Sequence, residues 1–242
     1  MGQPENTPPF FRLPRTQSNQ KEHNMKALVI GATGATGQAL LPLLAAAPQI
    51  AQIDSFGRRA PDFAHEKLHN HIIDFNNPQD WADAVRGDVV FACLGTTLKA
   101  AGSKQAQRRI DFDANLAFAR AARENGVQTL VLVSAAGADP TSRIFYPRMK
   151  GELEQAVAAL HFPHLLVFRP PLLIRPGSDR FGEKLAERLF AAFNAVGLLQ
   201  SQRPLPVADL ARAMLQAALN PPPRPVKIYP PADIRALLAK AA

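Results

Sequence analysis

Cysteine is almost absent from this 242-residue chain, which contains Cys93 and no second copy. A single cysteine excludes an internal disulfide and a metal site built from cysteines, and it fits a reducing cytosol. No apolar run approaches the roughly 20 residues of a membrane-spanning helix, and the N-terminal stretch lacks the apolar segment of a secretory signal. We therefore expect a cytoplasmic protein that does not associate with a membrane.

Aromatic residues are also scarce, at 7%, and they are not interleaved with the basic residues. The formal net charge of +8 could indicate nucleic-acid binding. However, the lysines and arginines are spread along the chain and are not gathered in one tract. We interpret the charge as a general surface bias that could attract an anionic cofactor, and we do not expect a nucleic-acid partner.

The six histidines offer no evident metal site. His65 and His69 are four residues apart, a spacing that aligns two ligands when it falls on a helix. Here the stretch leads from a loop into a predicted strand. We expect both residues, together with His71, to lie at the surface, and we expect no bound metal.

The chain is long enough for one sizeable domain, and 47% of its residues are hydrophobic. Residues 1–24 contain four prolines and no sustained periodicity, which predicts a flexible N-terminal arm. Residues 25–242 are predicted to form a single domain. Strand-like and helix-like segments alternate along it, with short connections.

The alternation predicts an α/β fold, a doubly wound parallel sheet with helices on both faces and a small C-terminal extension on the substrate side. Strands are predicted over 27–30, 50–56, 68–74, 88–94, 129–134, 164–168 and 226–229. Helices are predicted over 35–47, from 78 to about 86, from about 104 to 125, and over 147–160, 181–196, 209–219 and 234–242.

Three glycines follow the first predicted strand with the spacing G-x-x-G-x-x-G. Gly31 permits a tight turn, Gly34 lets a pyrophosphate approach the backbone, and Gly37 lets the next helix pack closely. The N–H groups and positive end of that helix favour phosphate. An ordinary strand–turn–helix corner is the alternative. A P-loop is disfavoured because neither Lys-Ser nor Lys-Thr follows the last glycine. The predicted cofactor contacts in this turn are Gly31, Thr33, Gly34, Ala35, Thr36 and Gly37.

The tip of the second predicted strand selects the nucleotide. NAD enzymes place an acidic residue there for the ribose 2′-hydroxyl, but this chain has Arg58 and Arg59. Arginine forms a forked, charge-assisted pair with a 2′-phosphate, so NADP(H) is predicted over NAD(H), with Arg58 favoured as the ligand. Plain solvated arginines are the alternative, and Asp54, within the strand, is the acidic rival.

Two further strand ends are candidate cofactor contacts. Asp74 and Phe75 close the third predicted strand, where an adenine would lie, although a simple turn before a helix explains them nearly as well. The fourth strand ends in a glycine and two hydroxyl residues, which suit a passing cofactor or a plain turn. These residues are Leu94, Gly95, Thr96 and Thr97.

Ser134, Tyr146 and Lys150 form a candidate catalytic set. Tyr146 is expected at or just before a helix N-cap, with Lys150 one turn later on the same side. A nearby ammonium favours the ionised phenol, so Tyr146 could give or take a proton while hydride moves. Ser134 would hold the carbonyl oxygen. Chance occurrence of Tyr-x-x-x-Lys as a surface pair is the alternative.

These motifs occur together and in order, and the chain resembles an atypical short-chain dehydrogenase/reductase. The resemblance covers about 25–235 and is to the NAD(P)-binding oxidoreductases of the Tat-interactive protein type and their bacterial relatives. It implies a Rossmann fold, bound NADPH and catalytic roles for the three residues above, Lys150 also holding the nicotinamide ribose. It further implies that 168–173, including Pro170 and Leu172, runs beside the nicotinamide, and that 203–209 returns toward the active site.

Pro147 departs from the usual pattern because a proline disfavours helical backbone at the preceding Tyr146. Two functions therefore stay open at this point. The first is an NADP-dependent oxidoreductase acting on a small carbonyl or alcohol substrate. The second is an NADPH-binding sensor that passes the redox state to a protein partner without robust turnover.

Overall fold

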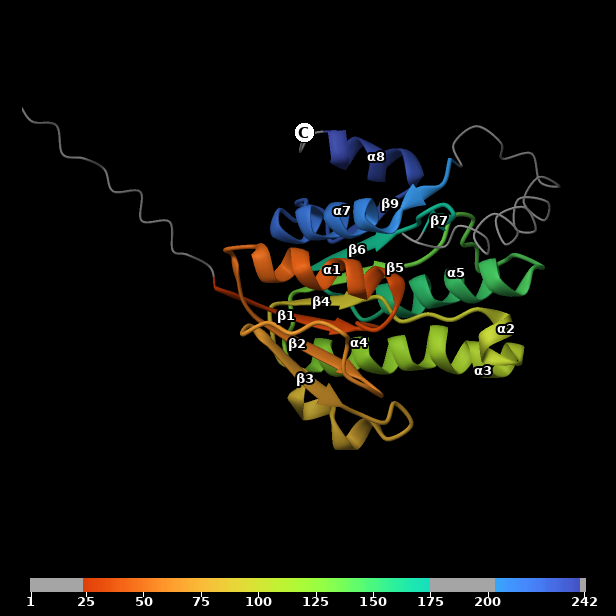
Figure 1. Cartoon of the computed structure of the whole chain (residues 1–242). Helices are drawn as coiled ribbons and strands as arrows, with labels where there is room; N and C mark the ends of the chain where they lie inside the picture. The colour runs from red at the N-terminus through yellow and green to blue at the C-terminus, as the bar shows by residue number, and fades with distance from the viewer. Residues whose placement is uncertain (1–23, 175–202, 240–242) are drawn as a thin grey trace, which may run out of the picture.

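A seven-stranded parallel sheet forms the centre of the computed structural model, which describes residues 24–174 and 203–239 (Figure 1). Its strand order is β3-β2-β1-β4-β5-β6-β9. The bounds are β1 Met25–Ile30, β2 Ile50–Gly57, β3 Leu68–Ile72, β4 Val89–Ala92, β5 Thr129–Val133, β6 His164–Phe168 and β9 Val226–Tyr229. A separate two-stranded sheet pairs β7 Leu173–Ile174 with β8 Leu205–Pro206. The predicted α/β class and parallel sheet are confirmed.

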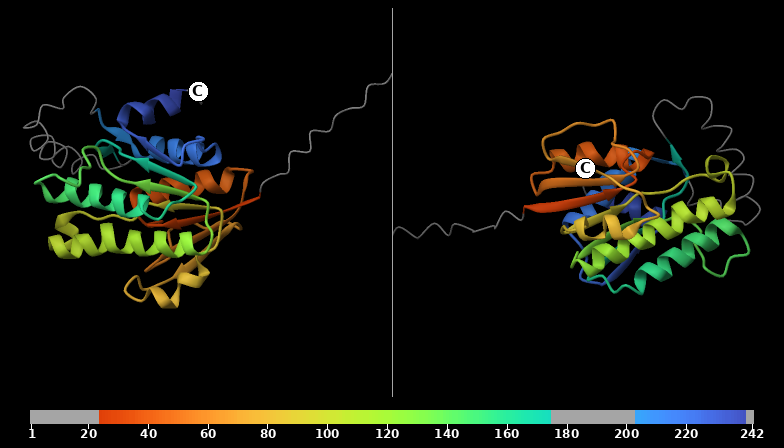
Figure 2. Two further views of the ribbon diagram at one scale, coloured as in Figure 1. Left: turned by 180° about the vertical axis from the view of Figure 1, so that it is seen from behind. Right: turned by 90° about the horizontal axis from the view of Figure 1, so that it is seen from below.

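Helices cover both faces of the sheet because successive side chains of each strand point to opposite sides. Ala27 and Val29 of β1 pack under α1 Ala35–Ala46, α7 Val207–Leu219 and α8 Pro231–Ala239. Leu28 and Ile30 pack on the other face, with α4 Asn115–Glu124 and α5 Phe145–Ala158. Figure 2 shows α4 and α5 side by side on that face.

The chain reverses its direction of strand addition at β1, which lies between β2 and β4. The first three strands extend the sheet one way from this point, and the next strands extend it the other way. In open parallel sheets ligands bind outside the carboxyl ends of strands at such a reversal. The fold therefore directs attention to the residues that follow β1, β2 and β4.

Several predicted elements needed correction. The helix from 78 to about 86 is wrong: two 3₁₀ helices, Pro78–Asp80 and Ala82–Ala84, occupy it. Between them Trp81 is buried, stacks on Phe118 and donates its indole N–H to the Asp74 carbonyl. Burial of this ring takes precedence over a regular helix.

The long helix expected from about 104 to 125 is divided into α3 Lys104–Arg108, a π-helix Arg109–Ala114 and α4. A short helix, α2 Leu98–Ala101, precedes it. The predicted arm, except for residue 24, and the predicted helix 181–196 lie outside the described residues.

Candidate functional site

The glycine turn after β1 has the geometry that its spacing indicates. Gly31 adopts φ +78°, and a Cβ there would lie 2.5 Å from the Cys93 carbonyl carbon of the neighbouring strand end. A Cβ at Gly37 would lie 2.3 Å from the Gly31 oxygen. Neither position accepts a side chain without moving backbone. The first turn of α1, whose N-cap is Gly34, therefore packs closely against the end of β1.

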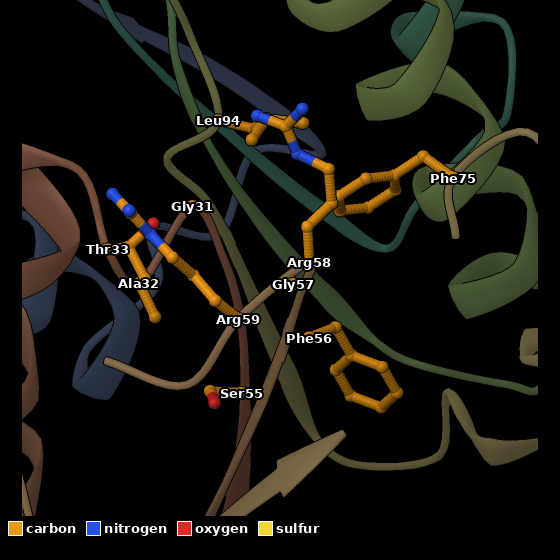
Figure 3. A pocket seen from close by; sticks show the side chains of 10 residues that line it. All are labelled: Gly31, Ala32, Thr33, Ser55, Phe56, Gly57, Arg58, Arg59, Phe75 and Leu94. Atoms are coloured by element: carbon orange, nitrogen blue, oxygen red, sulfur yellow. The ribbon is translucent and has the colours of Figure 1, made fainter. Parts of the chain in front are cut away.

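A pocket of about 330 Å³ opens beside this turn, between the ends of β1, β2 and β4 (Figure 3). Ten residues line it: Gly31, Ala32, Thr33, Ser55, Phe56, Gly57, Arg58, Arg59, Phe75 and Leu94. Six of them were predicted cofactor contacts. Ala32, Ser55, Phe56 and Gly57 were missed, although Ala32 and Gly57 are immediate neighbours of predicted residues and Ser55 and Phe56 lie on the strand that ends at Gly57.

The two arginines of the pocket extend in different directions. Figure 3 shows Arg59 reaching toward the glycine turn at Thr33, while Arg58 runs beside Phe75 toward Leu94. Both are exposed, and no carboxylate is among the ten lining residues. The pocket is therefore positively charged at the tip of β2.

Asp54, the acidic rival, is a buried ion-pair partner. Its carboxylate lies 2.7 Å from Lys26 Nζ, 3.0 Å from His71 Nε2 and 2.7 Å from Gln52 Nε2. Burial by itself raises the pKa of Asp54, but the hydrogen bonds and positive charge of these neighbours bring that pKa below its usual value. Only 2% of Asp54 is exposed, so its charge is used within the protein.

Asp74 also bonds to its own neighbours. Its carboxylate accepts hydrogen bonds from the Asn76 N–H and from the side-chain amides of Asn76 and Asn77. This arrangement matches the turn that was the alternative interpretation of Asp74. Phe75, the next residue, lines the pocket.

The Asp111 carboxylate binds the loop after β4. Thr96 N donates to Asp111 Oδ2 at 2.8 Å, and the nearest atom to a Cβ built on Gly95 would be Asp111 Oδ1. Thr97 instead caps α2, because its hydroxyl accepts from Ala100 N. Of this loop, Leu94 reaches the pocket lining.

The expected catalytic residues lie on β5 and α5. Lys150 is buried, and its Nζ donates to the Val133 carbonyl at 3.3 Å, next to Ser134. Tyr146 lies one turn before it and is half-buried. Its expected place before the helix was wrong, since α5 begins at Phe145. A proline in the first helical turn loses no helical hydrogen bond, so Pro147 does not end the helix at Tyr146.

The Ser134 hydroxyl has a partner that local sequence did not reveal. It donates to the Glu154 carboxylate, which also binds the Arg169 guanidinium at 2.6 Å. The hydrogen bond and charge of Glu154 raise the pKa of Arg169. Glu154 follows Lys150 by four residues on α5, which was the signal that a second polar side chain shares this helix face.

The segment after β6 lies between the end of β5 and the short strand β8. The Pro170 carbonyl accepts from Ala136 N, two residues beyond Ser134, and the Leu172 carbonyl accepts from Leu205 N of β8. Part of the returning stretch 203–209 is therefore beside this segment. Whether Pro170 and Leu172 contact a nicotinamide stays a prediction.

No helix in the two described ranges is long and apolar enough to cross a membrane. Within the same ranges, His, Cys, Asp and Glu form no group of three that could hold a metal ion. The cytoplasmic location stays a prediction. Fungal relatives carry the word mitochondrial in their names.

Comparison with known proteins gives a family. The NAD(P)H-binding family model matches residues 31–162, more than half of the chain. Protein FMP52, mitochondrial, from Candida albicans is 31% identical over 201 residues, which cover 80% of this chain and 88% of the relative. Protein HTATIP2 from Rattus norvegicus is 34% identical over 214 residues, 86% of this chain and 87% of the relative.

Among solved structures, MoeE5 in complex with UDP-glucuronic acid and NAD superimposes with a TM-score of 0.64 at 18% identity. The match covers 85% of this chain and 75% of that one, and it supports the fold alone. The match to HTATIP2 confirms the resemblance to the Tat-interactive protein type. With its glycine turn, parallel sheet and these relatives, the chain belongs to the NAD(P)H-binding family of Rossmann-fold proteins.

Proposed function

We propose that this protein is an NADP-dependent oxidoreductase that moves hydride to or from a small carbonyl or alcohol substrate. The carrying observation is the pocket beside the glycine turn, which has two arginines and no carboxylate in its lining. The negative charge of a 2′-phosphate complements the two arginines, which have no carboxylate partner in the pocket lining. The N-terminus of α1 and its neighbouring N–H groups suit the pyrophosphate.

The chain's own residues have distinct roles in this proposal. NADPH supplies the hydride when it is bound. Tyr146 gives a proton to the carbonyl oxygen as hydride reaches the carbonyl carbon, which yields an alcohol and leaves a phenolate. Lys150 lies one turn away, and its ammonium stabilises that phenolate and holds the nicotinamide ribose. The Lys150 side chain is only 4% exposed, so water screens its positive charge weakly.

Ser134 is proposed to hold the carbonyl oxygen, but its hydroxyl donates to Glu154 in this structure. It must turn away from Glu154 to serve the substrate. Ser134→Ala therefore separates two roles. Loss of turnover with unchanged thermal stability supports the catalytic one, whereas loss of stability with unchanged turnover assigns Ser134 to the Glu154 network.

The same contacts favour a second candidate, an NADPH-binding sensor without robust turnover that acts through a protein partner. Ser134 is engaged by Glu154, and Lys150 has an acidic partner in Asp111. Side chains so occupied can serve binding without chemistry. This candidate expects that no carbonyl compound is reduced and that NADPH changes the affinity for a protein.

A substrate panel tests the two candidates. Aldehydes, ketones and quinones are each incubated with the protein, and loss of NADPH absorbance is followed. Tyr146→Phe removes only the hydroxyl and should lower turnover by roughly 10²–10⁴-fold with nearly unchanged NADPH affinity. Tyr229→Phe is the matched control, since Tyr229 is the only other tyrosine and is buried against Phe168. Wild-type turnover by Tyr146→Phe would refute the catalytic assignment.

A further inference from the structure

Asp111 is the charge partner of Lys150, although 39 positions separate the two in sequence. Its Oδ1 lies 3.6 Å from Lys150 Nζ, and the side chains are 1% and 4% exposed. Its other oxygen accepts from Thr96 N at 2.8 Å. One buried carboxylate therefore connects helix α5 to the loop after β4, a loop that reaches the nucleotide pocket at Leu94.

Asp111 lies in the π-helix Arg109–Ala114, and a polar residue on each side of this helix binds the same loop. Gln107, Asp111 and Asn115 follow one another at intervals of four, and all three bond to the loop after β4. Gln107 Nε2 donates to the Thr96 carbonyl at 3.0 Å, and Asn115 Nδ2 donates to the Leu94 carbonyl at 3.0 Å. Asn115 Nδ2 also donates to the Ile110 and Asp111 carbonyls, which lie in the widened turn. π-Helical turns are rare in proteins, and those that occur are often found at functional sites.

The electrostatics of the pair have two sides. Burial raises the pKa of Asp111, while the Lys150 charge and the Thr96 N–H oppose that rise. The positive charge beside the Asp111 carboxylate is that of Lys150 on α5, and the loop after β4 contributes the Thr96 N–H. A buried pair of this kind often stabilises a fold no better than apolar residues would, so stability alone does not account for it.

We propose that Asp111 is a positioning residue, which keeps the Lys150 ammonium at the end of β5 and fixes the loop after β4 at a constant distance from it. Asp111 acts through Lys150 and does not touch the substrate. The proposal rests on the proposed NADPH-dependent function. It assigns to the π-helix the task of aligning the lysine with the pocket.

Asp111→Asn is the informative variant because it keeps an oxygen for Thr96 N and removes the charge. We expect kcat to fall by about 10²-fold, the scale of a small misplacement of a reacting group. Asp113→Asn is the matched control, since Asp113 is an exposed carboxylate two residues later in the same π-helix. Its kcat should equal that of the wild type. Equal kcat values in Asp111→Asn and Asp113→Asn, whether both lowered or both unchanged, would overturn the proposal.

A second measurement needs no turnover. Lys150→Met leaves Asp111 as an unpaired buried carboxylate, so the melting temperature of the full chain should fall by roughly 6 °C or more. Adding Asp111→Asn should recover at least half of that loss, because a neutral amide replaces the unpaired charge. A role limited to packing predicts losses that add.

These two measurements, together with a titration of the wild type with NADPH, separate the possible failures. Additive losses of stability, in a protein whose wild type binds NADPH, overturn the role of Asp111 and leave the proposed function standing. A wild type that gives no fluorescence change on titration with NADPH overturns the proposed function, and the positioning role with it, even where stability is recovered. Recovery together with the kcat loss supports the proposal.

Discussion

Removing a guanidinium from the pocket should change which nicotinamide cofactor the protein prefers. In Arg58→Ala, a 2′-phosphate loses one charged hydrogen-bond partner, an interaction worth roughly 1.5–3 kcal/mol. Arg58 is exposed, so solvent screening favours the lower end, about a tenfold loss of NADPH affinity. NADH has no 2′-phosphate, and its affinity should barely change.

The two arginines extend in different directions, so each single variant removes positive charge from a different part of the pocket. Arg59 extends toward the glycine turn and Arg58 toward Leu94 (Figure 3). Replacing both by alanine should abolish the preference for NADPH, because the pocket lining has no other arginine or lysine. Raising the salt concentration should narrow the difference between the cofactors in the wild type, since exposed charges are screened.

The assay is a calorimetric titration of each cofactor into each variant, checked by energy transfer from Trp81, the single tryptophan, to the bound reduced nicotinamide. Arg86→Ala is the matched control, because Arg86 is an exposed arginine whose Nε donates to the Asp83 carbonyl. Equal affinity of the wild type for NADPH and NADH would refute the reasoning. So would a tenfold loss in the control.

Three further predictions concern the turn, an internal ion pair and the arm. Gly31→Ala should abolish cofactor binding and lower the melting temperature, because the added Cβ meets the Cys93 backbone at 2.5 Å; calorimetry and thermal unfolding measure both. The pKa of Asp54 is lowered, so its stabilising effect is fully present above the usual value of 3.8 and is lost as the pH falls through the lower pKa of the folded state. The difference in unfolding free energy between wild type and Asp54→Asn, measured by urea unfolding, should therefore be smaller at pH 3.5 than at pH 7, and an unchanged difference would contradict the ion-pair role. A chain beginning at Met25 should keep its melting temperature and NADPH affinity, and a fall of several degrees would contradict the predicted flexible arm.

Local sequence determined the architecture because its signals act over a few residues. Continuous apolar runs indicated strands buried on both faces, as in Ala27–Ile30, which packs between the two helical layers. The glycine spacing fixed the turn, since a Cβ at Gly31 or Gly37 would overlap backbone. The two arginines lie at the tip of β2 as expected, whereas Tyr146 lies inside α5 and not before it, although Lys150 follows it by one helical turn as the spacing indicated.

Tertiary structure alone decided the partners of the buried polar groups. Lys150 pairs with Asp111, and Ser134 with Glu154, across 39 and 20 positions of sequence. No periodic pattern encodes such pairs, because a buried charge is satisfied by whichever group packing brings to it. The same holds for the burial of Trp81, which replaced a predicted helix by two short 3₁₀ turns. Sequence thus established a nucleotide-binding sheet, whereas packing between distant helices determined which side chains are free to act in it.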